Sequence, residues 1–240
     1  MCQLCDAAYA SRRRFMIGAG SLAASIAFGP PAFAKETKPP PKPENQISPD
    51  AALDRLIKGN ARYAAGVSRR HDFKHEREAL VGGQNPFAGI LSCADSRIAP
   101  EYAFDSGRGD LFVCRVAGNF ASNETIASLE YAAAVLNVPL FMVLGHDNCG
   151  AVDATIKSLK DNTTLPGHLP SLVSAIAPAV KATEGKPGDR LANAIRQNVI
   201  DNIAKLKSAT PILSAAVEQG KLKVVGGIYR LSDGKVEMLV

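Results

Sequence analysis

Two polar clusters, each placed directly after an apolar run, constrain this chain more than any other feature of its sequence. The first cluster is Cys93–Arg97 (CADSR), which follows the apolar run from Pro86 to Leu91. The second is His146–Cys149 (HDNC), which follows the run from Leu140 to Leu144. Short, continuously apolar runs are typical of strands buried in a parallel sheet. We therefore expect both clusters where a buried strand ends, as the two halves of one site.

The side chains of the two clusters suit zinc. Alternate residues of a strand face the same way, so Cys93 and Asp95 can address one point. His146 and Cys149 are three residues apart and would share one face of a turn that opens a helix. Two thiolates and one imidazole fill three of the four tetrahedral positions around zinc. The fourth position is left to water or to Asp95.

An open fourth position separates a catalytic zinc from a structural one, because water bound there loses its proton near neutral pH. Arg97 suits an open site, since its planar fork can hold the Asp95 carboxylate in a bidentate pair. That pair keeps Asp95 ionised and aimed as a hydrogen-bond acceptor. We therefore predict catalytic roles for Asp95 and Arg97, with Asp95 a metal ligand only in a closed state.

At these residues the chain resembles the β-class carbonic anhydrases, which carry a CxDSR motif and, further along the chain, an HxxCG motif. The two motifs are separated in this chain by about the same number of residues as in the family. The likeness also covers Arg115–Asn119 (RVAGN) and the pair Glu130–Tyr131, and it spans the chain from Asp50 to the C-terminus. The resemblance implies reversible hydration of carbon dioxide to bicarbonate and a proton. It also implies one Zn²⁺ per subunit and a homodimer or a multiple of dimers.

Two alternatives to carbon dioxide hydration stay open. A relative with the same ligands could hydrolyse another linear heterocumulene, such as carbon disulfide. The zinc could also be structural, closed by Asp95 in a non-catalytic binding protein. Arg97 argues against a structural site, because a site closed by Asp95 has no need of a guanidinium group that draws the Asp95 carboxylate away from the metal.

The resemblance further implies a substrate pocket lined by Gln84, Phe112 and Tyr131, because plant-like members of the class carry a Gln, a Phe and a Tyr at matching positions. Gln84 would donate its amide hydrogen to a substrate oxygen. From the residues alone, Phe112 and Tyr131 are better explained as ordinary core side chains.

The pattern of apolar runs predicts an α/β fold, with a mainly parallel β-sheet flanked by helices. The expected strands are 86–91, 111–116, 140–144 and 222–229, and the expected helices are 122–136, 151–159, 172–180 and 191–206. The turn at 232–234 leads into 236–239 and predicts a C-terminal hairpin at one edge of the sheet. Ser48 followed by Pro49 begins an N-terminal helical arm.

The N-terminus has the form of a twin-arginine signal peptide over residues 1–34. The basic residues Arg12–Arg14 precede a modestly apolar run, Ile17 to Phe28, and Ala32–Ala34 has the form of a signal-peptidase site. The alternative is an uncleaved membrane anchor, but the run is too short and too rich in small residues for a good span. We therefore expect a periplasmic protein with no stable membrane insertion after cleavage.

The remaining sequence is predicted to form a Pro/Lys-rich linker, residues 35–47, and a single zinc-dependent catalytic domain, residues 48–240. With 240 residues and 46% hydrophobic content, the chain can bury one sizeable core. A net charge of +5 with both signs interspersed does not favour nucleic-acid binding.

The other cysteines and histidines receive structural interpretations. Cys2 and Cys5 lie in the predicted leader, and no second pair faces them. Cys114 is expected to be a small buried apolar residue. His71 and His75 lie among basic residues and are expected on a solvated helical face.

Overall fold

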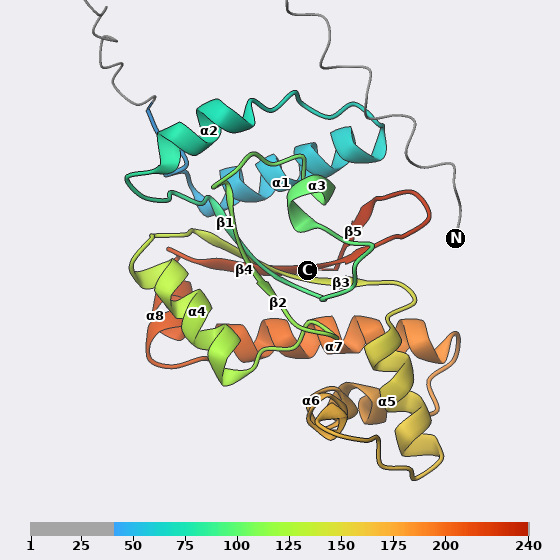
Figure 1. Cartoon of the computed structure of the whole chain (residues 1–240). Coiled ribbons are helices and arrows are strands. Elements are labelled where there is room, and N and C mark those ends of the chain that lie inside the picture. Colours follow the sequence, from blue (N-terminus) through green and yellow to red (C-terminus); the bar gives the residue numbers. More distant parts are fainter. Residues whose placement is uncertain (1–40, 240) are drawn as a thin grey trace, which may run out of the picture. The chain divides into compact units, whose positions relative to one another are not determined.

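A five-stranded sheet forms the centre of the protein (Figure 1). The structure, a computed structural model, describes residues 41–239, so the predicted signal peptide (1–34) and linker residues 35–40 lie outside it. The strands are β1 (Ala88–Ser92), β2 (Leu111–Arg115), β3 (Leu140–His146), β4 (Lys223–Tyr229) and β5 (Val236–Met238), in the order β2-β1-β3-β4-β5. The first four are parallel and β5 is antiparallel to β4. The predicted parallel sheet and edge hairpin are confirmed.

Helices cover both faces of this sheet (Figure 1). They are α1 (Pro49–Ala64), α2 (Phe73–Leu80), α3 (Pro100–Ala103), α4 (Asn123–Ala134), α5 (Gly150–Lys160), α6 (Leu169–Ala182), α7 (Arg190–Lys207) and α8 (Ile212–Glu218). The predicted caps of α1 and α4 are confirmed, because the hydroxyls of Ser48 and Ser122 accept hydrogen bonds from backbone N–H groups of the first turn. The short helices α3 and α8 were not predicted, since neither is long enough to show a helical period.

Alternation along the strands divides the core into two layers. Met142 of β3 packs with Leu56 of α1 on one face, whereas Val143 packs with Val199 of α7 on the other. Every residue of β1 and β3 is buried. The continuous apolar runs that predicted these two strands therefore reflect burial on both faces of the sheet.

The edge strand β2 departs from expectation. We expected it to be covered on both faces, but its residues are only partly buried and Arg115 is exposed. Cys114, expected to be buried, is likewise only partly buried. The physical reason is position, since β2 is paired with β1 on one side only.

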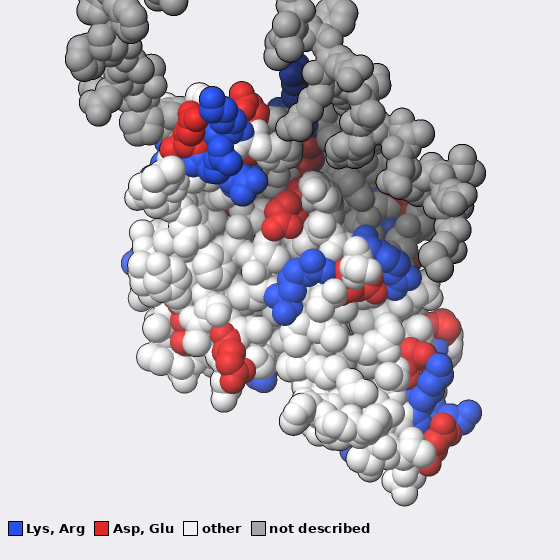
Figure 2. Space-filling view, viewed as in Figure 1, with Lys and Arg blue, Asp and Glu red and all other residues white. Residues whose placement is uncertain are grey.

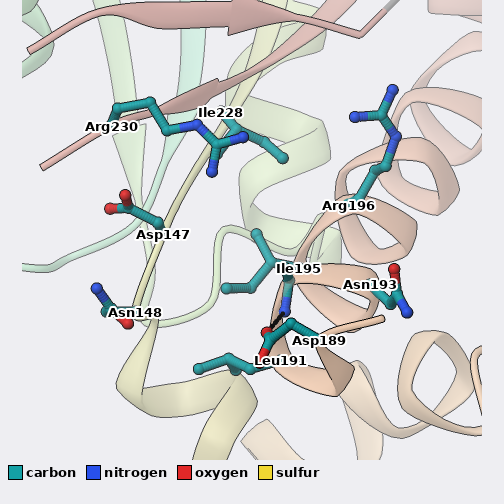
Figure 3. A pocket seen from close by; sticks show the side chains of 10 residues that line it. Asp147, Asn148, Asp189, Leu191, Asn193, Ile195, Arg196, Ile228 and Arg230 are labelled. Atoms are coloured by element: carbon teal, nitrogen blue, oxygen red, sulfur yellow. Dashed lines mark hydrogen bonds between the residues drawn. The ribbon is translucent and has the colours of Figure 1, made fainter. Parts of the chain in front are cut away.

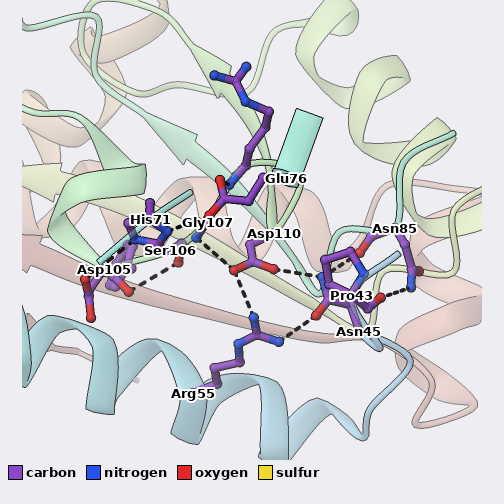
Figure 4. Close-up of polar contacts among 12 residues, drawn as sticks. Pro43, Asn45, Arg55, His71, Glu76, Asn85, Asp105, Ser106, Gly107 and Asp110 are labelled. Atoms are coloured by element: carbon purple, nitrogen blue, oxygen red, sulfur yellow. Dashed lines mark hydrogen bonds and ion pairs between the residues drawn. The ribbon is translucent and has the colours of Figure 1, made fainter. Parts of the chain in front are cut away.

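Residues 105–110, which lead into β2, are held to α1 by buried carboxylates (Figure 4). The Asp110 carboxylate accepts hydrogen bonds from Arg55 Nη2 at 2.8 Å and from Asn45 Nδ2 at 2.9 Å. Asn45 is 1% exposed, which corrects the predicted linker: its last residues pack on the domain instead of bridging to it. The buried contacts of Asn45 could not be read from a Pro/Lys-rich composition.

Asp105 is the second buried carboxylate in this segment. Its side chain is 1% exposed and accepts hydrogen bonds from Arg62 Nε at 2.5 Å and from the Arg69 backbone N–H at 2.9 Å. Burial raises the pKa of Asp105, but the bonds from Arg62 and Arg69 outweigh it and the net pKa is lowered.

His71 and His75 were both expected on a solvated helical face. His71 lies just before α2 and its Nδ1 is bonded to Glu76 Oε1 at 2.8 Å, so only His75 lies on that face.

Charges on the face shown in Figure 2 are mixed. Basic and acidic side chains lie next to one another on this face without a continuous basic stripe. Within residues 41–239, none of the helices combines the length and apolar character needed to cross a bilayer.

Replacing Arg62 with Met tests the Asp105 contact. Loss of the partner leaves a buried carboxylate without its charge complement, which should lower the free energy of unfolding by about 3–5 kcal/mol. Lys58→Met is the matched control, because it removes an exposed ion pair with Asp54 from the same helix and should change little. Urea denaturation measures both, and equal effects would contradict a specific role for Asp105.

The pH dependence of the same variant provides a second measurement. Because the pKa of Asp105 is lowered on folding, its stabilisation is present above the ordinary aspartate pKa and is lost as the pH falls through the folded value. Arg62→Met should therefore lose less stability on acidification than the unaltered protein.

Candidate metal centre

The two predicted half-sites meet at the carboxyl ends of β1 and β3. Cys93 follows β1, His146 ends β3, and Cys149 is the N-cap residue of α5. The donor atoms of these three residues all lie within 4.8 Å of one another. The side chains are buried, with exposures of 4%, 0% and 1%. Parallel pairing of β1 with β3 therefore builds the predicted trio from segments distant in sequence.

His146 is oriented to bind a metal through Nε2. Its Nδ1 lies 2.7 Å from the Asp147 carbonyl oxygen, so the Nδ1–H donates to that carbonyl. Nε2 is buried and has no hydrogen-bond partner in the described part of the chain. An unpartnered buried nitrogen beside two thiols fits a metal ion, and the sulfur and nitrogen donor set favours zinc.

The two cysteines shift each other's pKa in opposite directions. The neighbouring Cys149 thiol, opposed by burial, lowers the pKa of Cys93 to about 4. The same contact and burial raise the pKa of Cys149. Burial depresses the pKa of His146, but the neighbouring Cys93 sulfur and Asp95 carboxylate outweigh it and the net pKa is raised. The lowered pKa favours the thiolate form of Cys93, which is the form that binds metal.

Asp95 lies beside the trio but is held by Arg97. The Asp95 carboxylate accepts from Arg97 Nε at 2.9 Å, from Arg97 Nη2 at 2.6 Å and from the Arg97 backbone N–H at 2.9 Å. These bonds hold the pKa of Asp95 well below its ordinary value. Asp95 Oδ2 lies 3.8 Å from His146 Nε2. The predicted bidentate pair is therefore present, with an ionised oxygen next to the donor cluster.

Arg115 is a further arginine of this site, and the motif spacing assigned it no role. Its Nε donates to the Cys93 carbonyl oxygen at 3.0 Å and its Nη2 to the Asp95 carbonyl oxygen at 2.7 Å. These bonds hold the backbone of the CADSR segment against the end of β2. The sequence contained one sign of this role, which is the position of an arginine at the end of an otherwise apolar strand.

A small pocket flanks the metal centre (Figure 3). Its volume is about 240 Å³, and Asp147 and Asn148 face it from one side while Ile195 and Arg196 of α7 face it from the other. None of the three donor residues lines it. This pocket therefore lies beside the centre without opening onto the donor atoms.

The three residues expected to line the substrate pocket lie elsewhere in the chain. Gln84 is exposed and precedes β1, at the strand end opposite to Cys93. The Phe112 and Tyr131 rings pack together with centroids 6.4 Å apart, near the start of β2 and the end of α4. Tyr131 is 47% exposed. A single chain thus gathers Phe112 and Tyr131 but does not bring them, or Gln84, to the donor cluster.

Comparison with known proteins agrees with the geometry. The family described as carbonic anhydrase matches residues 88–236. Carbonic anhydrase 2 of Mycobacterium tuberculosis is 39% identical over 189 residues, which cover 78% of this chain and 91% of that protein. The structure of the β-carbonic anhydrase CafA of Aspergillus fumigatus has a TM-score of 0.61 at 27% identity and covers 79% of this chain and 89% of that one.

One further structure, at lower identity, bears on the fold alone. It comes from work on two tetrameric β-carbonic anhydrases of Sordaria macrospora and superposes with a TM-score of 0.64 at 24% identity. It covers 79% of this chain and 97% of the fungal chain.

The chain therefore belongs to the carbonic anhydrases, and within them to the β class. It is an enzyme that interconverts carbon dioxide and bicarbonate, and its Cys-His-Cys group is the candidate metal site.

Cys149→Ser tests this group. A hydroxyl is a poor ligand for a soft metal, so the variant should retain little bound metal and should melt at a lower temperature, because metal binding contributes to folding. Cys114→Ser is the matched control, since it changes a partly buried cysteine of β2 that is not in the donor group. Elemental analysis and thermal melts measure both. Equal metal content in the two variants would exclude Cys149 as a ligand.

Proposed function

We propose that this carbonic anhydrase uses one Zn²⁺ per chain, held by Cys93, His146 and Cys149. The observation that carries the proposal is the buried, unpartnered Nε2 of His146 beside two sulfur donors. Zinc bound there would lower the pKa of a coordinated water, so that a nucleophile is available near neutral pH.

Arg97 and Asp95 govern the fourth position in this proposal. Asp95 would complete a closed tetrahedral set if it turned toward the donors, and its Oδ2 lies only 3.8 Å from His146 Nε2. The three bonds from Arg97 oppose that movement. The remaining lone pairs of Asp95 Oδ2 are free to accept a hydrogen bond from the attacking water, which orients that water toward carbon dioxide.

The same arrangement weighs against a structural zinc. A structural site is closed by four protein ligands, whereas the donor group here contains three residues and Asp95 is engaged by Arg97. Stopped-flow hydration of carbon dioxide by the zinc-loaded and chelated protein distinguishes these functions. Rates no higher than those of the chelated form would remove the catalytic assignment. Hydrolysis of carbon disulfide, assayed in parallel, tests the alternative that the protein is a related heterocumulene hydrolase.

Arg97→Ala separates catalysis from metal binding. The variant should keep its zinc, because Arg97 bonds to no donor residue's side chain, but its kcat/KM should fall by about 100-fold or more as Asp95 loses its orientation. Arg77→Ala in α2 is the control, since Arg77 is an exposed arginine remote from the motif. Near-normal turnover of Arg97→Ala would exclude Arg97 from the mechanism.

We further propose that the active unit is a homodimer or a multiple of dimers. Gln84, Phe112 and Tyr131 lie away from their own chain's metal centre, so a second copy would have to supply them. The partly buried edge strand β2 and the half-exposed Tyr131 ring offer an uncovered surface for that copy.

Subunit mixing tests this proposal. Gln84→Ala and Arg97→Ala homo-oligomers should both be impaired. A mixed dimer would pair an intact Arg97 on one chain with an intact Gln84 on the other, which restores one complete site. Hydration assays after denaturation and joint refolding should therefore show activity that neither variant has alone. No recovery, with mixed oligomers demonstrated by mass spectrometry, would place Gln84 in its own chain's site or in none.

The predicted leader, residues 1–34, supports a proposal of periplasmic location through the twin-arginine pathway. Replacing Arg12 and Arg13 with Lys should keep the protein in the cytoplasmic fraction of an export-competent cell, whereas the unaltered chain should be cleaved and released with the periplasm. A full-length product that fractionates with the membrane would support the uncleaved anchor instead.

A further inference from the structure

Residues 116–121 form the turn between β2 and α4, and this turn reaches back to the metal centre. The Gly118 backbone N–H donates to Cys93 Sγ at 3.3 Å. Gly118 has φ +83°, and a Cβ there would lie 2.5 Å from Ile176 Cδ1. Asn119 follows with φ +42°. Two successive left-handed residues persist only where the surroundings determine the backbone strongly, so something must hold this turn.

Three side chains of α7 hold it. Asn198 Nδ2 donates to the Gly118 carbonyl oxygen at 2.8 Å, and Asn202 Oδ1 accepts from the Ala121 N–H at 2.7 Å. Lys205 Nζ donates to the Ala121 carbonyl oxygen at 2.6 Å. Positions 198, 202 and 205 share one face of the helix, because residues three or four apart are neighbours on a helix surface. One face of α7 therefore bonds to both ends of the turn.

The burial of two asparagine side chains on one face of α7 requires an explanation. Asn198 is 2% exposed and Asn202 is 6% exposed, on the face of α7 whose Val199 packs into the core beneath the sheet. A buried amide is costly unless its hydrogen bonds are made. Here they are made with the turn and with each other, since Asn202 Nδ2 also donates to the Asn198 carbonyl oxygen at 2.7 Å. Apolar residues would fill this face but would leave the turn without partners.

We propose that Asn198 and Asn202, with Lys205, are positioning residues for the metal centre. They hold the turn so that the Gly118 N–H stays on Cys93 Sγ. An N–H donor on a ligating sulfur withdraws electron density from it and fixes the direction of its lone pairs, so these residues set how strongly Cys93 donates to the metal. This inference rests on the proposed metal ligation by Cys93.

Co²⁺ is the probe, because its thiolate charge-transfer band reports electron donation by sulfur without an activity assay. Asn198→Asp keeps the side-chain shape but loses the N–H that reaches Gly118. The band should move to longer wavelength, because the sulfur donates more strongly without the N–H. The Kd for Co²⁺ should nevertheless rise about tenfold, because the turn no longer holds Cys93 in the binding geometry. Asn193→Asp is the matched control: it makes the same change on the same helix, where the amide donates to the Pro187 carbonyl oxygen, and its band should not move.

Lys205→Met provides a second variant, should Asn198→Asp fail to fold, because Lys205 is exposed and the methionine keeps the apolar stem. Its band should shift in the same direction by less. The inference would be overturned if the variants that fold kept the band of the unaltered protein and showed only a lower melting temperature of the metal-free form. The three side chains of α7 would then support the fold and not the metal centre. Absence of the band in the unaltered protein would instead remove thiolate ligation, and the inference with it.

Discussion

The parallel register between β1 and β3 is the constraint on which the active site depends. Ser92 pairs with Leu144, so the two strands end side by side. Cys93 follows Ser92, and His146 lies two residues after Leu144 as the last residue of β3, so both lie at the same carboxyl end of the sheet. A shift of one residue would turn the alternating side chains of β3 to the opposite face and separate the donors. The burial of every residue in both strands opposes such a shift.

Around this centre, the backbone is held by side-chain bonds more than by regular structure. Arg115 fixes the carbonyl groups of Cys93 and Asp95, while Arg97 holds the Asp95 carboxylate. On the far side, α7 holds the turn that carries Gly118. Each bond reduces the freedom of a candidate donor residue or of the nearby carboxylate, and so favours a single geometry of the site. Such pre-organisation is what allows electrostatic effects to act on a reaction.

The remaining features of the fold support the proposal that a second copy of the chain completes the enzyme. Phe112 and Tyr131 form an aromatic pair at the edge strand, away from the metal centre, and Tyr131 stays half-exposed. A monomer gains little from leaving an aromatic ring in water. A second copy of the chain on this surface would bury the ring and would account for a strand that is paired on one side only.

The sequence by itself determined the fold class, the succession of the main strands along the chain and the identity of the candidate metal donors, because these depend on local periodicity and on the chemistry of CADSR and HDNC. Only the tertiary structure decided that β2 and Cys114 lie at a partly exposed edge, that Asn45 belongs to the domain, and that Arg115 and Asn198 bond to the segments around the donor group. Burial and side-chain bonding are set by contacts between residues far apart in the chain, as in the Asn198 to Gly118 bond. A local pattern carries no record of such a contact, and that is the physical reason for the division.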